Sequence, residues 1–87
     1  MDGRTILSLN LRRIRVAKGI SQERLAYDSG MDRSYVSGIE RGIENPTIDV
    51  IDRLAKVLDV PIDQLLSAPS GKKPPQGLRR GRKPKDS

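Results

Sequence analysis

Apolar residues recur at helical spacing along most of the chain, beginning close to the first residue. Leu7, Leu11 and Ile14 follow the i, i+4, i+7 spacing of one helix face. This pattern predicts a first helix over about residues 4–18. Gly19 follows directly, and a glycine in this place is typical of the left-handed cap that ends a helix.

Two shorter helices are predicted next, each with a capping side chain in front of it. Ser21 is a good N-cap for a helix over residues 22–29, which Gly30 then ends. Asp32 is placed to cap a third helix over about residues 32–41, and a further glycine stops that helix. Only a tight glycine turn therefore separates the second and third helices.

The next part of the chain predicts a strongly amphipathic fourth helix and a short fifth one. Thr47 is placed to cap the fourth helix. Its apolar face is formed by Ile51, Leu54, Ala55 and Leu58. Pro61 is expected in the first turn of a helix over residues 61–66. Since no segment shows the alternation of a strand, we predict an all-α fold, a compact five-helix domain over residues 1–67.

The second and third helices carry the framework of a helix-turn-helix. Ala26 is small where the third helix crosses close to the second, and Gly30 can take the positive φ that makes the turn sharp. Val36 and Ile39 face the domain, so the opposite side of the third helix faces solvent. In a helix-turn-helix, this helix lies in the DNA major groove. The framework residues are Leu25, Ala26, Gly30, Val36 and Ile39.

Composition excludes several classes of function. The chain has 87 residues, of which 34% are hydrophobic, so it has room for one small core. There is no cysteine and no histidine, which excludes disulfides, thiolate metal sites and the commonest general base. We therefore predict no catalytic residues, no metal site, no cofactor and no enzyme activity. No apolar run is long enough to span a membrane, and residues 1–10 lack the apolar stretch of a signal peptide. We expect a reduced, cytoplasmic protein of a prokaryotic cell.

The net charge of +6 is confined to the C-terminal end of the chain. Residues 1–69 hold ten basic and ten acidic residues, whereas residues 70–87 hold seven basic residues and one acidic residue. From Ala68 onward the sequence has too few apolar side chains to offset the entropy of ordering. We predict that residues 68–87 form a disordered basic tail. Its charge is explained either by a polyanionic partner or by a solubilising role.

With these motifs in place, the chain resembles the lambda-repressor-like helix-turn-helix family, also called Cro/C1-type or XRE. The resemblance covers about residues 5–66 and extends to the order of the helices. The stretch MDRSYVSGIERGIENPTI is similar to the recognition helices of controller proteins of restriction–modification systems. The resemblance implies binding of double-stranded DNA, with the third helix in the major groove.

The resemblance also implies roles for individual side chains. The family reads bases from the exposed face of the third helix, at the positions held here by Arg33, Ser34 and Ser37. The planar fork of Arg33 suits a bidentate contact to guanine O6 and N7. Tyr35 could also pack on a thymine methyl group. The residues that resemble contacts to the DNA backbone are Gln22, Tyr35, Arg41, Asn45 and Thr47.

Two further expectations come from the same family. It often links an arginine late in the first helix to a glutamate late in the third, and Arg15 and Glu40 match those positions. The pair would orient the third helix without touching bases. At Gly38 many relatives place a longer polar residue. Glycine there implies a narrower reading surface, or a third helix that sits closer to the bases.

The tail segment LRRGRKPK resembles an AT-hook, the Arg-Gly-Arg-Pro core that lies in the minor groove of A·T-rich DNA. It departs from that core because Lys83 stands between Arg82 and Pro84. Plain phosphate contacts by a polycation are the favoured interpretation. The candidate tail contacts are Arg79, Arg80, Arg82 and Lys83.

A two-fold dimer is expected, because one short helix reads too few base pairs for useful specificity. The family binds palindromic sites whose half-sites lie about one helical turn, roughly 34 Å, apart. The dimer surface must be apolar and lie away from the third helix. The candidates are Ile62, Leu65 and Leu66, with Ile48 or Ile51 as additions. One of the two adjacent leucines is instead expected to close the monomer core.

The sequence therefore predicts a sequence-specific transcription regulator that acts as a homodimer on a palindromic operator. A restriction–modification controller and a general repressor both fit this prediction, and RNA polymerase or a partner protein is a further expected partner. Two other classes stay open. One is an antitoxin-type protein that binds a partner toxin and regulates its own gene. The other is an architectural protein that binds DNA through the basic tail with little sequence preference.

Overall fold

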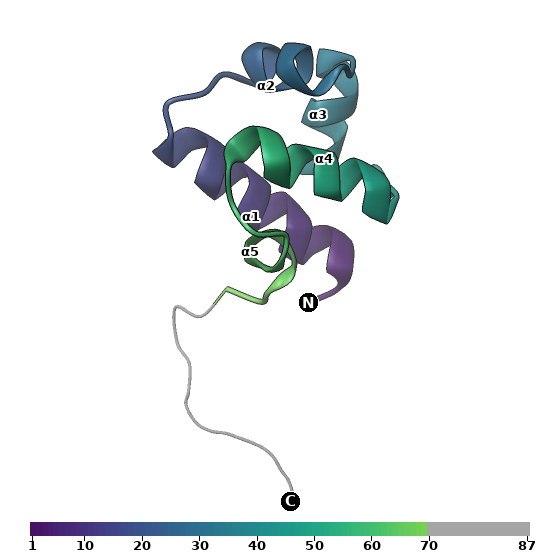
Figure 1. Ribbon diagram of the computed structural model, residues 1–87. Helices are drawn as coiled ribbons and strands as arrows, with labels where there is room; N and C mark the ends of the chain where they lie inside the picture. The colour runs from purple at the N-terminus through teal and green to yellow at the C-terminus, as the bar shows by residue number, and fades with distance from the viewer. Residues whose placement is uncertain (70–87) are drawn as a thin grey trace, which may run out of the picture.

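The computed structural model describes residues 1–69 as an all-helical domain (Figure 1). Five helices follow one another, and residues 1–69 contain no strand. They are α1 (Gly3–Ala17), α2 (Gln22–Ser29), α3 (Arg33–Glu40), α4 (Ile48–Leu58) and α5 (Asp63–Leu66). The predicted all-α, five-helix class is confirmed. The first three helices lie within one residue of their predicted bounds, and α4 begins directly after its predicted cap, Thr47. None of the described helices is long and apolar enough to cross a bilayer.

The helices begin and end at residues whose chemistry suits those places. The side chains of Ser21 and Thr47 accept the backbone N–H groups of Arg24 and Val50, as predicted for N-caps. Asp2 caps α1 in the same way and was not predicted. Its bond from the Thr5 backbone N–H, 2.9 Å long, holds the pKa of the Asp2 carboxyl below its usual range.

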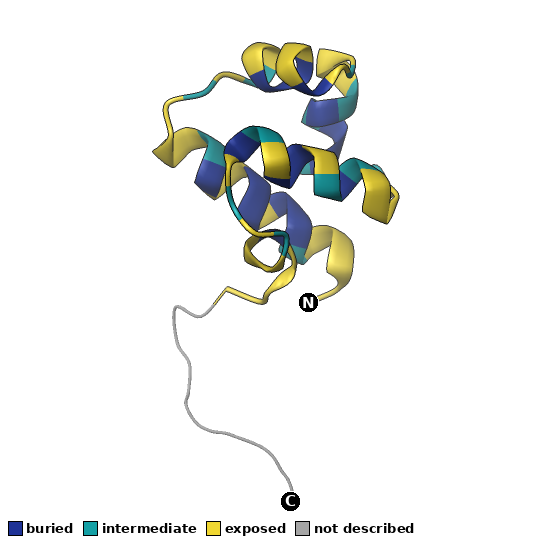
Figure 2. Cartoon of the chain, in the orientation of Figure 1, coloured by how far each residue is buried: buried dark blue, intermediate teal, exposed yellow. Residues whose placement is uncertain are grey.

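The core is aliphatic and lies between the packed faces of the helices. α1 packs against α3 and α5, and α2 packs against α3 and α4. Figure 2 shows the buried stripes of α1, α3 and α4 facing inward, with exposed residues along the outer sides. The buried apolar side chains are Leu7, Leu11, Ile14, Leu25, Ala26, Val36, Ile39, Ile51, Leu54, Ala55, Leu58 and Leu65. The helical periodicity therefore predicted the core faces of the first four helices correctly.

Two local predictions are wrong. Asp32 precedes α3 in the N-cap place, but its side chain makes no capping hydrogen bond; only its backbone carbonyl accepts from Tyr35 and Val36. The fifth helix is also shorter than predicted, because α5 begins at Asp63 and Pro61 lies outside it. The carbonyl of Pro61 instead accepts from Gln64 N in a tight turn that leads into the helix.

A buried polar contact that the apolar pattern did not reveal joins the two ends of the domain. The Asn10 side chain on α1 is 1% exposed. Its Nδ2 donates to the backbone oxygens of Leu65, at 3.0 Å, and Ser67, at 2.7 Å. These carbonyls lie at the C-terminal end of α5, where a helix has no partners of its own for them. Asn10 therefore holds the short α5 against α1.

Candidate nucleic-acid interface

The turn between α2 and α3 has the sharp geometry that the framework residues predict. Gly30 has φ of +70°, the left-handed conformation that glycine adopts without strain, and nothing lies where a side chain would stand. The N–H of Met31 donates back to Ala26 O at 2.9 Å and closes the turn. Leu25, Ala26, Val36 and Ile39 are all buried, so both helices are pinned to the core and their outer sides stay free.

The outer side of α3 carries the predicted base-reading residues. With 100° between successive residues of a helix, Ser34 and Ser37 lie on the side opposite to Val36 and Ile39. Ser34 is exposed and Ser37 is half-buried. Arg33 is the first residue of α3 and is exposed. In a helix-turn-helix, the N-terminal residues of this helix contact base edges, so Arg33 is well placed to reach them.

One carboxylate connects the three helices that surround this turn. Glu40, at the end of α3, accepts from Arg15 Nε at 2.6 Å and Arg15 Nη2 at 3.0 Å. Gln22, at the start of α2, donates to Glu40 Oε1 at 3.0 Å, and Arg15 Nη1 donates to Ile20 O at 2.7 Å. The side chains of Arg15 and Glu40 are 12% and 3% exposed. The pair therefore braces α3 against α1 and α2 from the side away from solvent.

Two predicted DNA-backbone residues are engaged inside the protein. The Gln22 amide is held toward Glu40 by the bond described above, so its nitrogen is not simply presented to solvent. Tyr35 is half-buried and packs against the core. The two side chains therefore help to hold α2 and α3 in position. The prediction had assigned them only contacts with DNA.

The other predicted backbone contacts lie around the loop between α3 and α4. Arg41, Asn45 and Thr47 are all exposed. Thr47 Oγ1 accepts from Val50 N, so its hydroxyl oxygen is used as the N-cap of α4. Asn45 lies at the rim of a shallow apolar groove. Arg41 follows α3 directly and extends the positive charge of its outer side.

Comparison with known proteins identifies the family. A sequence model described as helix-turn-helix, HTH_3, matches residues 11–65, more than half of the chain. The chain belongs to this helix-turn-helix family. The predicted resemblance to Cro/C1-type regulators, including controller proteins, is confirmed.

Three similar proteins illustrate the family. A hypothetical transcription factor of Neisseria meningitidis is 46% identical over 78% of this chain, which spans only 64% of that relative's length. Control protein C.BamHI of Bacillus amyloliquefaciens is 39% identical over 72% of this chain and 79% of its own. The crystal structure of the restriction-modification controller protein C.AhdI of Aeromonas hydrophila shares 47% identity and a TM-score of 0.69, over 71% of this chain and 94% of that one. These relatives support DNA-binding transcription regulation as the general role of this helix-turn-helix protein.

Gly38 does not form an open part of the reading surface, so the interpretation of that position is corrected. It lies on the outer side of α3, yet it is buried. The side chain of Glu44, from the loop after α3, covers it: a Cβ at position 38 would stand 2.6 Å from Glu44 Cγ. Sequence reasoning did not single out Glu44. The signal was available, since glycine inside a helix costs about 1 kcal/mol relative to alanine and needs a packing reason.

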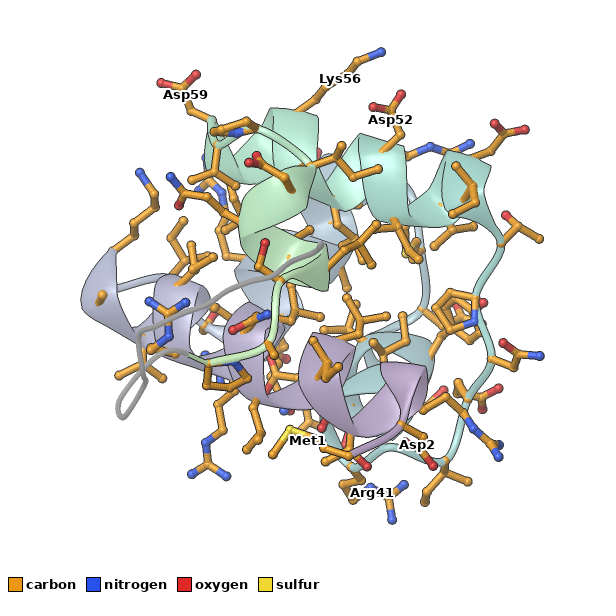
Figure 3. The ribbon with its side chains drawn as sticks, turned by 90° about the horizontal axis from the view of Figure 1, so that it is seen from below. Met1, Asp2, Arg41, Asp52, Lys56 and Asp59 are labelled. Carbon is orange, nitrogen blue, oxygen red and sulfur yellow. The ribbon has the colours of Figure 1, made fainter. Side chains whose placement is uncertain are left out.

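Two acidic residues of this helix-turn-helix protein lie on the side of the domain away from Arg41. Asp52 and Asp59 lie along the outer face of α4 with Lys56, and Figure 3 shows them on the opposite side from Arg41. Lys56 pairs with Asp52 at 3.1 Å. A polyanion is repelled by the carboxylates of Asp52 and Asp59 and attracted by the guanidinium groups of Arg33 and Arg41.

The predicted dimer residues divide into buried and exposed ones. Leu65 is fully buried, so it cannot contact a partner. Ile51 keeps only 5% of its surface exposed, and Ile62 is half-buried against the core. The dimer role of Leu65 is therefore wrong, and Leu65 is the leucine that closes the monomer core, because α5 packs on α1. The dimer role of Ile51 and Ile62 stays a prediction. Leu66 and Ile48 stay available, with 41% and 63% of their surfaces exposed. The predicted tail contacts, Arg79, Arg80, Arg82 and Lys83, lie outside the described residues.

Proposed function

We propose that this protein is a sequence-specific transcription regulator that binds double-stranded DNA with α3 in the major groove. The observation that carries the proposal is the outer side of α3. Exposed Arg33 and Ser34 and half-buried Ser37 lie there, on a helix braced from behind by the Arg15–Glu40 pair. A rigid helix matters because base edges are read only when donors and acceptors meet them in register. Arg33 reads guanine, and Arg41, Asn45 and Thr47 hold the DNA backbone.

The protein acts as a two-fold dimer on a palindromic operator. A shallow groove of about 250 Å³ supports this proposal, because it is lined by exposed Ile48 and Leu66 and by the edge of buried Ile51. Apolar side chains of this kind gain by meeting the same groove of a second copy. The groove also includes Asn45, so the proposed dimer surface adjoins the proposed DNA-backbone contacts. As in other helix-turn-helix dimers, the half-sites would lie roughly 34 Å apart.

Control of a promoter by a small DNA-binding protein is the cellular role that the relatives favour. Two of the three similar proteins described above are a control protein and a restriction-modification controller protein. We propose that this chain regulates transcription in the same general way, in the cytoplasm of a prokaryotic cell. The identity of neighbouring genes would then distinguish a restriction–modification controller from a general repressor.

Selection of bound duplexes from a random pool is the direct test of this function. The wild-type protein is expected to enrich a palindromic site with a guanine at one position of each half-site. Arg33→Ala should weaken binding to that site by about 1–3 kcal/mol and relax the preference for guanine, because the bidentate contact is lost. Lys56→Ala removes the same charge from the opposite side and should leave the enriched site unchanged. Failure of the wild-type protein to enrich any site would refute the proposal.

An architectural role for the basic tail is the second candidate, and the charge distribution favours testing it. The whole net charge of +6 resides in residues 70–87. Deleting these residues is expected to weaken binding to all duplexes alike and to flatten the dependence of affinity on salt, because phosphate contacts are lost. Titrations of the selected site and of random DNA at several salt concentrations measure both effects. A loss confined to the selected site would instead indicate groove reading by the tail.

A further inference from the structure

The side chain of Glu44 lies over α3 at Gly38, where the helix itself has no side chain. A Cβ at position 38 would lie 2.6 Å from Glu44 Cγ and 3.1 Å from Glu44 Oε2, and real Cβ atoms do not approach so closely. The absence of a side chain at Gly38 is therefore what allows Glu44 to lie over the helix. Gly38 stands next to Ser34 and Ser37 on the outer side of α3. Glu44 thus borders the residues proposed to read bases.

The loop that carries Glu44 is folded back on α3 by its own backbone. Gly42 takes φ of +73°, which reverses the chain directly after the helix. The N–H groups of Ile43 and Glu44 then donate to Gly38 O at 2.9 and 3.3 Å. The position of Glu44 is therefore set by main-chain bonds to the residue that it covers.

The Glu44 carboxylate has no fixed partner in the part of the chain that the structure describes. No residue among 1–69 forms a hydrogen bond or an ion pair with the Glu44 side chain, whereas Glu40, the last residue of α3, accepts three hydrogen bonds. Glu44 is half-buried, and its oxygens are not sealed from solvent. A bare carboxylate on the outer side of α3 weakens phosphate binding, so it is a poor element of a purely electrostatic surface.

A carboxylate does suit one kind of base edge in the major groove. It only accepts hydrogen bonds, and cytosine N4 and adenine N6 are the amino groups that a base pair presents there. Guanine presents two acceptors and thymine one acceptor with a methyl group, so both repel a carboxylate. Adenine offers its amino group next to the N7 acceptor, which favours an amide side chain over a carboxylate. Cytosine is therefore the base that Glu44 recognises best.

We propose that Glu44, seated over Gly38, is a specificity-determining residue that selects cytosine at one position of each half-site. The inference rests on the proposed function, since it requires α3 to lie in the major groove. It adds a residue from outside α3 to the reading surface and explains why residue 38 of that helix is a glycine. Position 38 has no side chain because the neighbouring loop supplies one.

Four variants test this assignment when each is put through the same random-pool selection and then through titration of single-base variants of the selected site. The wild-type protein should prefer cytosine at one position by roughly fivefold or more. Glu44→Ala should reduce that preference to below about twofold and raise affinity for random DNA, because the amino group loses its acceptor and the phosphates lose a repelling charge. Glu44→Gln should shift the preference to adenine, whose N6 and N7 match an amide.

Gly38→Ala provides the structural arm of the test, because its methyl group displaces the Glu44 side chain without altering charge. It should relax the same base position as Glu44→Ala. The double variant Gly38→Ala/Glu44→Ala should bind like Glu44→Ala alone, since the two changes remove one interaction. Thermal unfolding of each variant at one protein concentration identifies loss of folding, and Glu44→Ala and Glu44→Gln carry the test if Gly38→Ala does not fold.

The outcomes separate this inference from the proposed function. If the wild-type protein selects a site that depends on Arg33, but Glu44→Ala and Glu44→Gln select that same site with unchanged preferences at every position, the assignment of Glu44 is overturned and the proposed function stands. Relaxation at several positions at once would also overturn it, because that result indicates a shifted α3. If the wild-type protein selects no site, the proposed function fails and this inference fails with it.

Discussion

Replacing Glu40 with alanine is expected to lower the free energy of unfolding by about 3 kcal/mol and to weaken DNA binding at the same time. The carboxylate is 3% exposed and accepts hydrogen bonds from Arg15 and Gln22. Its removal leaves the Arg15 guanidinium, itself 12% exposed, without its charge partner. A buried charge that loses its partner is costly, even where the intact pair adds little net stability.

The effect on DNA binding follows from the place of the pair. Glu40 is the last residue of α3, and Arg15 and Gln22 belong to α1 and α2. Without the carboxylate, α3 keeps its apolar contacts through Val36 and Ile39 but loses the polar contacts that set its angle. A helix that no longer holds one orientation presents its side chains to the bases less effectively. Affinity for the selected site should therefore fall more than affinity for random DNA.

Chemical denaturation and titration of the selected site measure the two effects together. Asp28→Ala is the matched control, because it also removes one carboxylate from an arginine, in the Arg24–Asp28 pair. That pair is much more exposed and should contribute no more than about 0.5 kcal/mol. If Glu40→Ala unfolds at the same denaturant concentration as the wild-type protein and binds the site equally well, the bracing role of the pair is wrong.

Periodicity predicted the core of this domain well because burial follows from one-dimensional spacing. Each of the first four helices presents an apolar stripe, and residues such as Leu11, Leu25 and Leu54 are fully buried. Glycine positions predicted the helix ends equally well, since Gly19, Gly30 and Gly42 all take the positive φ that their places require. Local chemistry alone determines these features, so a single sequence is enough to find them.

The parts that escaped prediction depend on contacts between distant or loosely placed residues. Asp32 has the right residue type for a cap, but residue type does not determine its rotamer. Leu65 and Leu66 are adjacent and equally apolar, and only the way α5 packs on α1 decides which is buried. Glu44 reaches Gly38 because a backbone reversal intervenes, and no spacing rule for helices describes that approach.

The candidate interface shows the same division. Exposure of Arg33 and Ser34 follows from the helix pattern, whereas the use of Gln22 and Tyr35 inside the protein does not. Glutamine and tyrosine have both polar and apolar atoms, so their spacing is compatible with a solvent-facing or an inward role. The outward face of the recognition helix was therefore predictable, and the supports behind it were only partly so.

Replacing Asn10 with aspartate is expected to be similarly damaging, although it changes a single atom of the side chain. Asn10 Nδ2 donates to the backbone oxygens of Leu65 and Ser67, and a carboxylate at that place would face both oxygens with no proton to donate. The site is 1% exposed, so solvent cannot replace the lost bonds. We expect the free energy of unfolding at pH 7 to fall by about 3 kcal/mol, because a buried carboxylate oxygen then faces two unsatisfied carbonyls. Arg13 Nη2, which donates to Asn10 Oδ1 at 3.3 Å, compensates only the other oxygen.

The loss should depend on pH in one direction. A protonated carboxyl can still donate to one of the two oxygens, so the folded variant favours the proton and the charged form is the destabilising one. Relative to the wild-type protein, the variant should be least destabilised near pH 4 and progressively more destabilised as the pH rises to 7. Denaturation curves at pH 4, 5.5 and 7, recorded at one protein concentration because dimerisation adds stability, measure this trend.

Loss of the Asn10 contacts should act first on α5 and, through it, on association between copies. Apolar contacts of Leu65 and Ile62 would then hold this short helix to the core, and Leu66, which lines the proposed dimer groove, would lose its fixed place. Sedimentation should show a weaker dimer for Asn10→Asp than for the wild-type protein. The control for the loss of stability is Asn45→Asp, the same change at an exposed position, which should alter the free energy of unfolding by less than about 0.5 kcal/mol. Equal stability of Asn10→Asp and the wild-type protein at pH 7 would mean that the end of α5 is held by its apolar contact alone.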